Sequence, residues 1–161
     1  ELIGCLVGSE MCIRDRAVCF KEAMTDDFVN YQKQIIKNAK SMCEDFQKLG
    51  FETVQPQTDN HLLLLDLRNK NITGKDAEEL LGKVNITLNK NSIPNDPESP
   101  FVTSGVRIGT AAVTTRGFKE EECSKIVKLI GEAIENKDKP EILQKVKMKA
   151  ADLCSKFPVY K

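Results

Sequence analysis

The chain has 161 residues, enough for one domain with a buried core, and its 24 Lys and Arg are balanced by 24 Asp and Glu. This balance excludes a strong overall field that would draw the protein to nucleic acid or to an anionic membrane. No apolar run is long enough to span a bilayer, so we expect neither nucleic acid nor a membrane among the partners.

The six cysteines are widely spaced, form no C-x-x-C pair, and accompany a single histidine. Structural zinc sites combine Cys and His at short spacings, so this pattern predicts no metal site. A secreted disulfide framework is disfavoured at this length and spacing. We therefore expect reduced thiols in an intracellular protein.

The first 16 residues (ELIGCLVGSEMCIRDR) differ in character from the rest of the chain. A short apolar piece precedes charges, without the basic start or the small-residue cleavage site of a signal peptide. The string GSEMCIRD resembles translated adapter sequence found at the ends of transcript-derived proteins. The expectation is therefore a non-native, adapter-like leader over 1–16 and a domain over 17–161.

A long helix is expected at about 25–50. Thr25 supplies a capping hydroxyl, Asp26 and Asp27 place negative charge at the positive end of the helix dipole, and Gly50 suits a left-handed C-cap. Apolar residues then recur on one face at helical spacing. The expected core residues of this helix are Phe28, Tyr31, Ile35, Ala39, Met42, Phe46 and Leu49.

Strands and helices alternate beyond this helix. Strands are expected at 51–54, at 61–67 (the apolar run HLLLLDL), at 86–88 and around 106–108. Helices are expected at 73–83, 118–136 and 140–157, with a turn at 114–117. Their expected inner residues are Ala77, Leu80, Leu81, Val84, Cys123, Ile126, Val127, Ile130, Ile134, Ile142, Val146, Ala150 and Leu153. This order predicts an α+β fold with helices mainly on one face of the sheet.

Several catalytic templates are absent from the sequence. The chain has no glycine-rich phosphate loop of the Walker or dinucleotide kind and no G-x-S-x-G motif. His61 is the single candidate base for a Ser–His or Cys–His scheme. Because it begins a strand after Thr58, Asp59 and Asn60, we interpret it as a structural hydrogen-bonding residue rather than a general base.

Arg107 lies between Val106 and Ile108 in an apolar strand. Burial on at least one side is predicted from these flanks, and a guanidinium in such a place is costly unless it meets an anion. Its planar fork fits a carboxylate in two-point contact. The alternative is an arginine on an edge strand that reaches solvent, and the residues alone leave both interpretations open.

The loop before this strand combines polar groups with one aromatic residue. Asn91, Ser92, Ser99 and Ser104 offer hydrogen-bonding groups beside Phe101. Such a mixture suits a small anionic or heteroaromatic ligand. An ordinary surface loop stiffened by its three prolines remains equally compatible with the pattern.

Six segments resemble, in order, the C-terminal part of serine hydroxymethyltransferases, which are fold-type I pyridoxal-phosphate enzymes. The similarity covers about residues 17–136. The matching segments are FKEAM at Phe20–Met24, TDNHLLLLDLR at Thr58–Arg68, TGKDAEELL at Thr73–Leu81, ITLNKNSIPND at Ile86–Asp96, SPFVTSGVRIGT at Ser99–Thr110 and TTRGF at Thr114–Phe118. The resemblance implies the C-terminal small domain of such a transferase, with a small, mainly antiparallel sheet.

The resemblance also implies roles for individual residues. Arg107 corresponds to the arginine that holds the carboxylate of serine or glycine. Asn91 resembles a residue that contacts the folate pteridine, and Ser99–Phe101 (Ser99, Pro100 and Phe101) resembles part of the tetrahydrofolate pocket. His61 receives no catalytic step. Ala111 stands where the family usually has proline, which loosens a turn without removing a ligand group.

The resemblance further implies that the catalytic centre is incomplete. The family's Schiff-base lysine, its phosphate-binding residues and the aspartate that pairs with the pyridine nitrogen lie upstream, and nothing in this chain matches them. We therefore expect no catalytic residue here, and an inactive fragment of an enzyme that interconverts serine and glycine with one-carbon transfer to tetrahydrofolate. The alternative is a non-catalytic folate-binding or subunit-interaction module derived from the same domain.

For the intact enzyme, the resemblance implies pyridoxal 5'-phosphate as the cofactor, held mostly by the missing domain. Serine, glycine and tetrahydrofolate are the implied substrates. The implied assembly is a homodimer or homotetramer. The expected location is intracellular, and cytoplasmic rather than mitochondrial or plastid.

Overall fold

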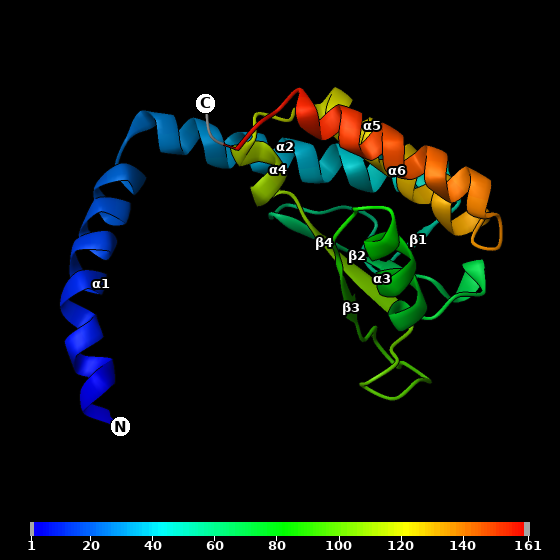
Figure 1. The fold of residues 1–161 in the computed structure, drawn as a ribbon, viewed down its shortest axis with the longest axis horizontal. Helices are drawn as coiled ribbons and strands as arrows, with labels where there is room; N and C mark the ends of the chain where they lie inside the picture. Colours follow the sequence, from blue (N-terminus) through cyan, green and yellow to red (C-terminus); the bar gives the residue numbers. More distant parts are fainter. Residues whose placement is uncertain (1, 160–161) are drawn as a thin grey trace. The chain divides into compact units, whose positions relative to one another are not determined.

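The computed structural model describes residues 2–159, with side chains from residue 13 onward (Figure 1). The side chains of the first 12 residues, which make up most of the predicted leader, lie outside the described part. The structure has two parts, the first ending at Lys33 and the second beginning at Gln34. None of the helices within residues 2–159 combines the length and the apolar character needed to cross a membrane.

The first part contains helix α1 (Leu2–Ala23) and the beginning of helix α2 (Asp26–Lys48). The predicted N-cap is confirmed, because Thr25 Oγ1 accepts a hydrogen bond from the Phe28 backbone N–H at 3.2 Å. The rings of Phe28 and Tyr31 contact each other with centroids 5.8 Å apart. Both side chains are only half-buried, so the predicted inner face is covered incompletely at this end of α2.

The second part contains a four-stranded antiparallel sheet of order β1-β2-β4-β3. The strands are β1 (Glu52–Thr53), β2 (Leu62–Asp66), β3 (Asn89–Asn91) and β4 (Gly105–Gly109). The strand predicted at 86–88 is displaced toward the C-terminus. Ile86 and Leu88 pack in the core, but pairing with β4 begins only at Asn89, which lies opposite Arg107.

The helices of the second part follow the predicted order. They are α3 (Gly74–Lys83), α4 (Ala111–Thr115), α5 (Glu120–Glu135) and α6 (Pro140–Ser155), with a short 3-10 helix η1 (Arg68–Lys70). Thr73 caps α3 by accepting from Asp76 N–H at 3.1 Å. The turn predicted at 114–117 is confirmed by a hydrogen bond from Gly117 N–H to the Thr114 carbonyl at 2.9 Å. The short helix α4, whose last residues are Thr114 and Thr115, was not predicted.

One hydrophobic core lies between the sheet and the helices, and Figure 1 shows α5 and α6 on the same side of the sheet. The sheet contributes alternate residues of β2 and β4, and α2 contributes Met42 and Phe46. The buried side chains include Leu63, Leu65, Val106, Ile108, Ala77, Leu81, Val127, Ile130, Val146 and Ala150. This confirms an α+β fold with helices mainly on one face of the sheet. Leu49 was predicted to lie in the core but is 38% exposed.

Buried polar bonds fix the end of β4 to helix α2. Thr110, which is fully buried, donates from Oγ1 to the Ile35 carbonyl at 2.9 Å. Asn38 Nδ2 donates to Thr114 Oγ1 at 2.8 Å and to the Phe118 carbonyl at 2.9 Å. Because buried polar groups that lose their partners are costly, these bonds specify where β4 ends relative to the helices.

Candidate functional site

Arg107 lies in β4 and its side chain is exposed. Its neighbours Val106 and Ile108 are buried because they point to the opposite face of the sheet. The predicted burial of the guanidinium is therefore wrong. The alternative is confirmed in that the side chain reaches solvent, but β4 is not an edge strand, since it pairs with β2 on one side and with β3 on the other. Among the side chains of residues 13–159, the guanidinium has no hydrogen-bond or ion-pair partner.

We define the open face as the side of the sheet that carries Leu62, Leu64, Arg107, Asn89 and Asn91. Residues opposite each other in an antiparallel pair share a face, and Arg107 lies opposite both Leu64 and Asn89. Asn91 lies opposite Gly105, two residues along β4 on the same face. The structure therefore brings together two of the predicted site residues, Arg107 and Asn91.

The third predicted element, Ser99–Phe101, lies in the loop of residues 92–104 between β3 and β4. Figure 1 shows this loop extending beyond the sheet, away from α5 and α6. The Ser99 carbonyl accepts from the N–H groups of Val102 and Thr103, both at 2.9 Å, which forms a tight turn. Phe101 is 84% exposed at this turn. No hydrogen bond or ring contact found within residues 13–159 joins the turn to Arg107.

A second arginine near the open face is already paired. Arg68 Nη2 lies 2.6 Å from Asp66 Oδ2, and Arg68 Nε lies 3.0 Å from the same oxygen. The side-chain hydrogen bond from Arg68, which outweighs the effect of desolvation, lowers the pKa of the Asp66 carboxyl. Arg68 therefore has its carboxylate within the chain, whereas the Arg107 fork faces outward without one.

His61 does not have the role predicted for its side chain. The imidazole is exposed and has no hydrogen-bond partner among the described side and main chains. Its backbone carbonyl instead accepts from Thr110 N–H at 2.9 Å. The hydrogen bonds of the preceding turn come from Thr58 and Asn60, which bind the backbone of Leu62 at 2.7 and 2.9 Å.

The described lysines do not form a covalent site for pyridoxal phosphate. A lysine that holds a carbonyl cofactor has to be enclosed and readily neutral. Every lysine from Lys21 to Lys156 is exposed or half-exposed. Lys70, one of the least exposed, is bound by the Leu49 carbonyl at 3.1 Å and lies 4.3 Å from the centre of the Phe51 ring. The residues present therefore do not fit this cofactor by themselves.

The buried cysteines are also unsuited to covalent chemistry. Cys123 lies in the core, and burial raises the pKa of its thiol to about 12. Burial likewise raises the pKa of the Cys43 thiol. Since the thiolate is the nucleophilic form, both side chains are unreactive packing residues at neutral pH.

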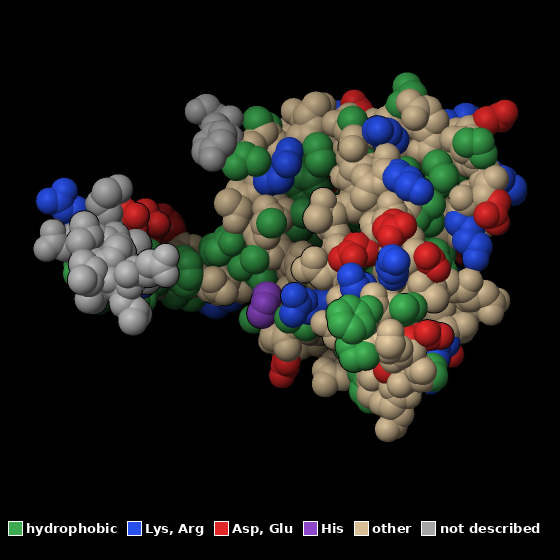
Figure 2. All heavy atoms as spheres, turned by 60° about the horizontal axis from the view of Figure 1, so that its bottom comes forward, with side chains coloured by type: hydrophobic (Ala, Val, Ile, Leu, Met, Phe, Trp, Pro, Cys, Tyr) green, Lys and Arg blue, Asp and Glu red, His purple; other side chains and the backbone are tan. Residues whose placement is uncertain are grey.

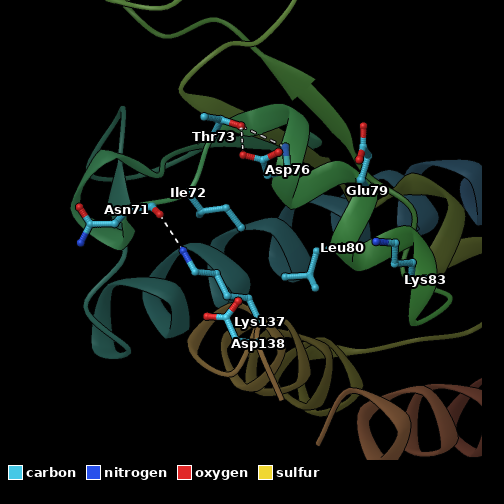
Figure 3. Close-up of a pocket in the computed structure, with 9 residues that line it drawn as sticks. All are labelled: Asn71, Ile72, Thr73, Asp76, Glu79, Leu80, Lys83, Lys137 and Asp138. Carbon is cyan, nitrogen blue, oxygen red and sulfur yellow. Dashed lines mark hydrogen bonds between the residues drawn. The ribbon is translucent and has the colours of Figure 1, made fainter. Parts of the chain in front are cut away.

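A pocket of about 320 Å³ lies beside α3, and none of the predicted site residues lines it (Figure 3). Two hydrogen-bonded pairs lie among its lining residues. Lys137 Nζ donates to the Asn71 carbonyl at 2.9 Å, and Thr73 Oγ1 donates to the Asp76 carboxylate at 2.7 Å. Charges of both signs are interspersed on the face drawn in Figure 2. The open face carries the unpaired Arg107 together with Asn91 and is therefore the better candidate site.

The fold agrees with the class expected from the sequence. A small antiparallel sheet with helices mainly on one face is consistent with the small domain of a pyridoxal-phosphate-dependent transferase. The sequence profile of one such family, described as serine hydroxymethyltransferase, matches residues 7–130. The chain belongs to the serine hydroxymethyltransferase family.

Curated relatives agree with this assignment. The chain is similar to a serine hydroxymethyltransferase of Acinetobacter baumannii, with 53% identity over 148 residues, which cover 92% of this chain and 36% of the relative. A Pseudoalteromonas atlantica relative is 52% identical over 155 residues, 95% of this chain and 37% of its own length. A Francisella tularensis relative is 52% identical over 149 residues, 92% of this chain and 36% of its own length. The chain thus spans little more than a third of the length of these relatives.

Proposed function

We propose that this chain is a fragment of an enzyme that interconverts serine and glycine and passes a one-carbon unit to tetrahydrofolate. In this proposal the chain supplies the arginine for the substrate carboxylate and part of the folate site. The observation that carries the proposal is the outward-facing Arg107 guanidinium on the open face of a domain of this family.

The surroundings of Arg107 suit a carboxylate. The half-buried Leu64 lies beside it on the open face and limits hydration on one side. The nearby Arg68 is engaged by Asp66 and does not compete for the ligand. A guanidinium can contact both oxygens of an amino-acid carboxylate, which fixes the orientation of the substrate as well as its charge.

The folate role falls to Asn91 and to Ser99–Phe101. Asn91 Nδ2 donates to the Ser92 carbonyl at 2.7 Å, which orients the amide on the open face. The exposed Phe101 ring offers a flat apolar surface to a heteroaromatic ligand such as a pteridine. Ser99 and Pro100 shape the turn that presents this ring. These contacts would make part of a pocket, with the remainder supplied from outside the described residues.

Pyridoxal 5'-phosphate supplies the electron sink for this reaction when it is bound. The lysine that binds it is proposed to lie outside this chain, and the chain alone is therefore proposed to be inactive. The native domain is proposed to span 17–161 with a non-native leader at 1–16, although the family profile already matches from residue 7. The intact enzyme is proposed to be a cytoplasmic homodimer or homotetramer.

A hybrid protein tests this function. In the hybrid, this chain replaces the segment that it matches in the Acinetobacter baumannii relative. We expect the hybrid to convert serine to glycine in the presence of tetrahydrofolate and pyridoxal phosphate, because the two parts together complete the site. The chain alone, and the relative without its segment, are the controls and should show no turnover.

Two outcomes would count against the proposal. A hybrid that folds and binds pyridoxal phosphate but does not turn over serine would contradict the assigned role of this chain. Tetrahydrofolate binding by the chain alone, as tight as by the hybrid, would instead support the non-catalytic folate-binding module.

A further inference from the structure

One carboxylate, that of Asp96, joins the beginning, middle and end of the loop of residues 92–104. Its Oδ2 accepts from Ile93 N–H at 3.1 Å and from Ser104 N–H at 2.9 Å. Its Oδ1 accepts from Ser104 Oγ at 2.6 Å and from Glu98 N–H at 2.9 Å. Each oxygen thus accepts two hydrogen bonds. The backbone N–H of Asp96 adds a bond to the Ile93 carbonyl at 3.1 Å.

These bonds place Ile93 against the sheet. The side chain of Ile93 is buried over Gly105, the first residue of β4. A Cβ on Gly105 would lie 2.5 Å from Ile93 Cγ2 and 2.6 Å from the Leu65 carbonyl oxygen, so only glycine allows this approach. The loop is therefore held at one end by apolar packing and at the other by the Asp96 carboxylate.

The loop also contains a strained residue next to the end that Asp96 holds. Thr103 adopts φ of 62°, a left-handed conformation that is unfavourable for a β-branched residue. Its carbonyl accepts from Gly74 N–H at 2.9 Å, which ties the loop to α3. Strain of this kind persists only where the surrounding structure over-determines it, and it is common at ligand-binding segments.

The charge of Asp96 suits this arrangement. Partial burial opposes ionisation of the carboxyl, but the hydrogen bonds from Ser104, Glu98 and Ile93 outweigh it and hold the pKa of Asp96 well below its usual value. The group is therefore ionised at neutral pH and accepts all four bonds as a charged acceptor. Such bonds are shorter and stronger than those between neutral groups.

We propose that Asp96 is a positioning residue that holds the turn Ser99–Phe101 in the geometry needed to bind tetrahydrofolate. The inference rests on the proposed function, since it assigns a cause to the shape of the folate-binding loop. Asp96 acts through the backbone of the loop and touches no reacting atom. Arg107 is held independently, because β4 is paired on both sides and its end is fixed to α2.

A graded set of variants separates positioning from general stability. Asp96→Asn keeps the shape of the side chain, but its amide can accept at most two of the four bonds. Ser104→Ala removes only the hydroxyl bond and keeps the other three. Glu98→Gln is the matched control, because this exposed side chain changes from carboxylate to amide in the same loop without altering the Asp96 bonds.

Two measurements are needed. Amide hydrogen exchange on the 161-residue chain should be faster at Ile93, Glu98 and Ser104 in Asp96→Asn by about tenfold or more, because two charge-assisted bonds are lost. In the hybrid, KM for tetrahydrofolate should rise by about tenfold, while kcat and KM for serine stay within about threefold. Ser104→Ala should give smaller changes in the same direction, and Glu98→Gln should match the unaltered hybrid.

The outcomes distinguish this inference from the function on which it rests. Faster exchange with an unchanged KM for tetrahydrofolate would overturn the inference and leave the proposed function standing. Unchanged exchange in Asp96→Asn would overturn it as well, because the carboxylate would not be holding the loop. An unaltered hybrid without serine turnover would overturn the proposed function and this inference together.

Discussion

Replacing Arg107 by alanine in the hybrid should lower kcat/KM for serine by about a hundredfold or more. The guanidinium has no carboxylate partner within the described chain, so its charge is available to the ligand. Its loss removes both points of contact with the substrate carboxylate. Steady-state kinetics with serine as the varied substrate measures the effect, with most of the change expected in KM.

Arg107→Lys should also be poor, because an ammonium group cannot reproduce the planar two-point fork. The matched control is Arg68→Lys, which makes the same change at an arginine already paired with Asp66 and keeps a cation beside that buried carboxylate. This control should keep kcat/KM for serine within about threefold, because the paired arginine is not proposed to contact the substrate. Near-normal kinetics for both Arg107 variants would mean that another group holds the carboxylate.

Phe46→Ala should destabilise the chain by about 3–5 kcal/mol, the cost of emptying a large buried site. Phe46 is fully buried on α2, and its ring meets that of Phe51 edge-on with centroids 5.4 Å apart. Equilibrium unfolding in urea, followed by circular dichroism, gives the difference in free energy. The substitution should lower the urea concentration at the midpoint of unfolding without altering the slope of the unfolding free energy against urea concentration.

Leu49→Ala is the informative control for this measurement. The sequence pattern predicts Leu49 on the same core face as Phe46, whereas the structure leaves it partly exposed near the end of α2. Its replacement should cost less than about 2 kcal/mol, the lower limit for a buried leucine. Equal losses of unfolding free energy for the two variants would contradict the structure, in which Leu49 lies outside the core.

The helices could be predicted closely because their signals are local. Thr25 and Thr73 cap helices through their own hydroxyl groups, Gly50 adopts φ of 73° after α2, and Pro140 begins α6. These signals depend on neighbours within one turn of the chain. The short helix α4 was missed because its stability comes in part from Asn38, far away in the sequence.

Arg107 shows what a linear pattern leaves out. The linear pattern treats its apolar neighbours as its surroundings, although the alternation of a strand sends them to the opposite face. The ligand interpretation from the residues alone rested on this burial, and the observation that supports it in the structure is the unpaired, exposed fork. Pairing with β2 and β3, which the sequence does not specify, decides that Asn91 shares its face.

Asp96 was missed for a similar reason. The run Pro-Asn-Asp-Pro predicts a turn, but turn propensity does not name the partners of the carboxylate. Two of its four hydrogen bonds come from Ser104, eight residues later in the chain. That contact exists only when the loop closes over Gly105. A functional role for this aspartate could therefore be inferred only from the folded structure.

A crystal structure of the hybrid with pyridoxal phosphate and serine would locate both halves of the proposed site at once. We expect two guanidinium nitrogens of Arg107 at about 2.7–2.9 Å from the two serine carboxylate oxygens. We also expect that the lysine bound to the cofactor comes from the relative's part of the hybrid. A serine carboxylate held by other residues, or a cofactor bound to a lysine of this chain, would contradict the proposed function.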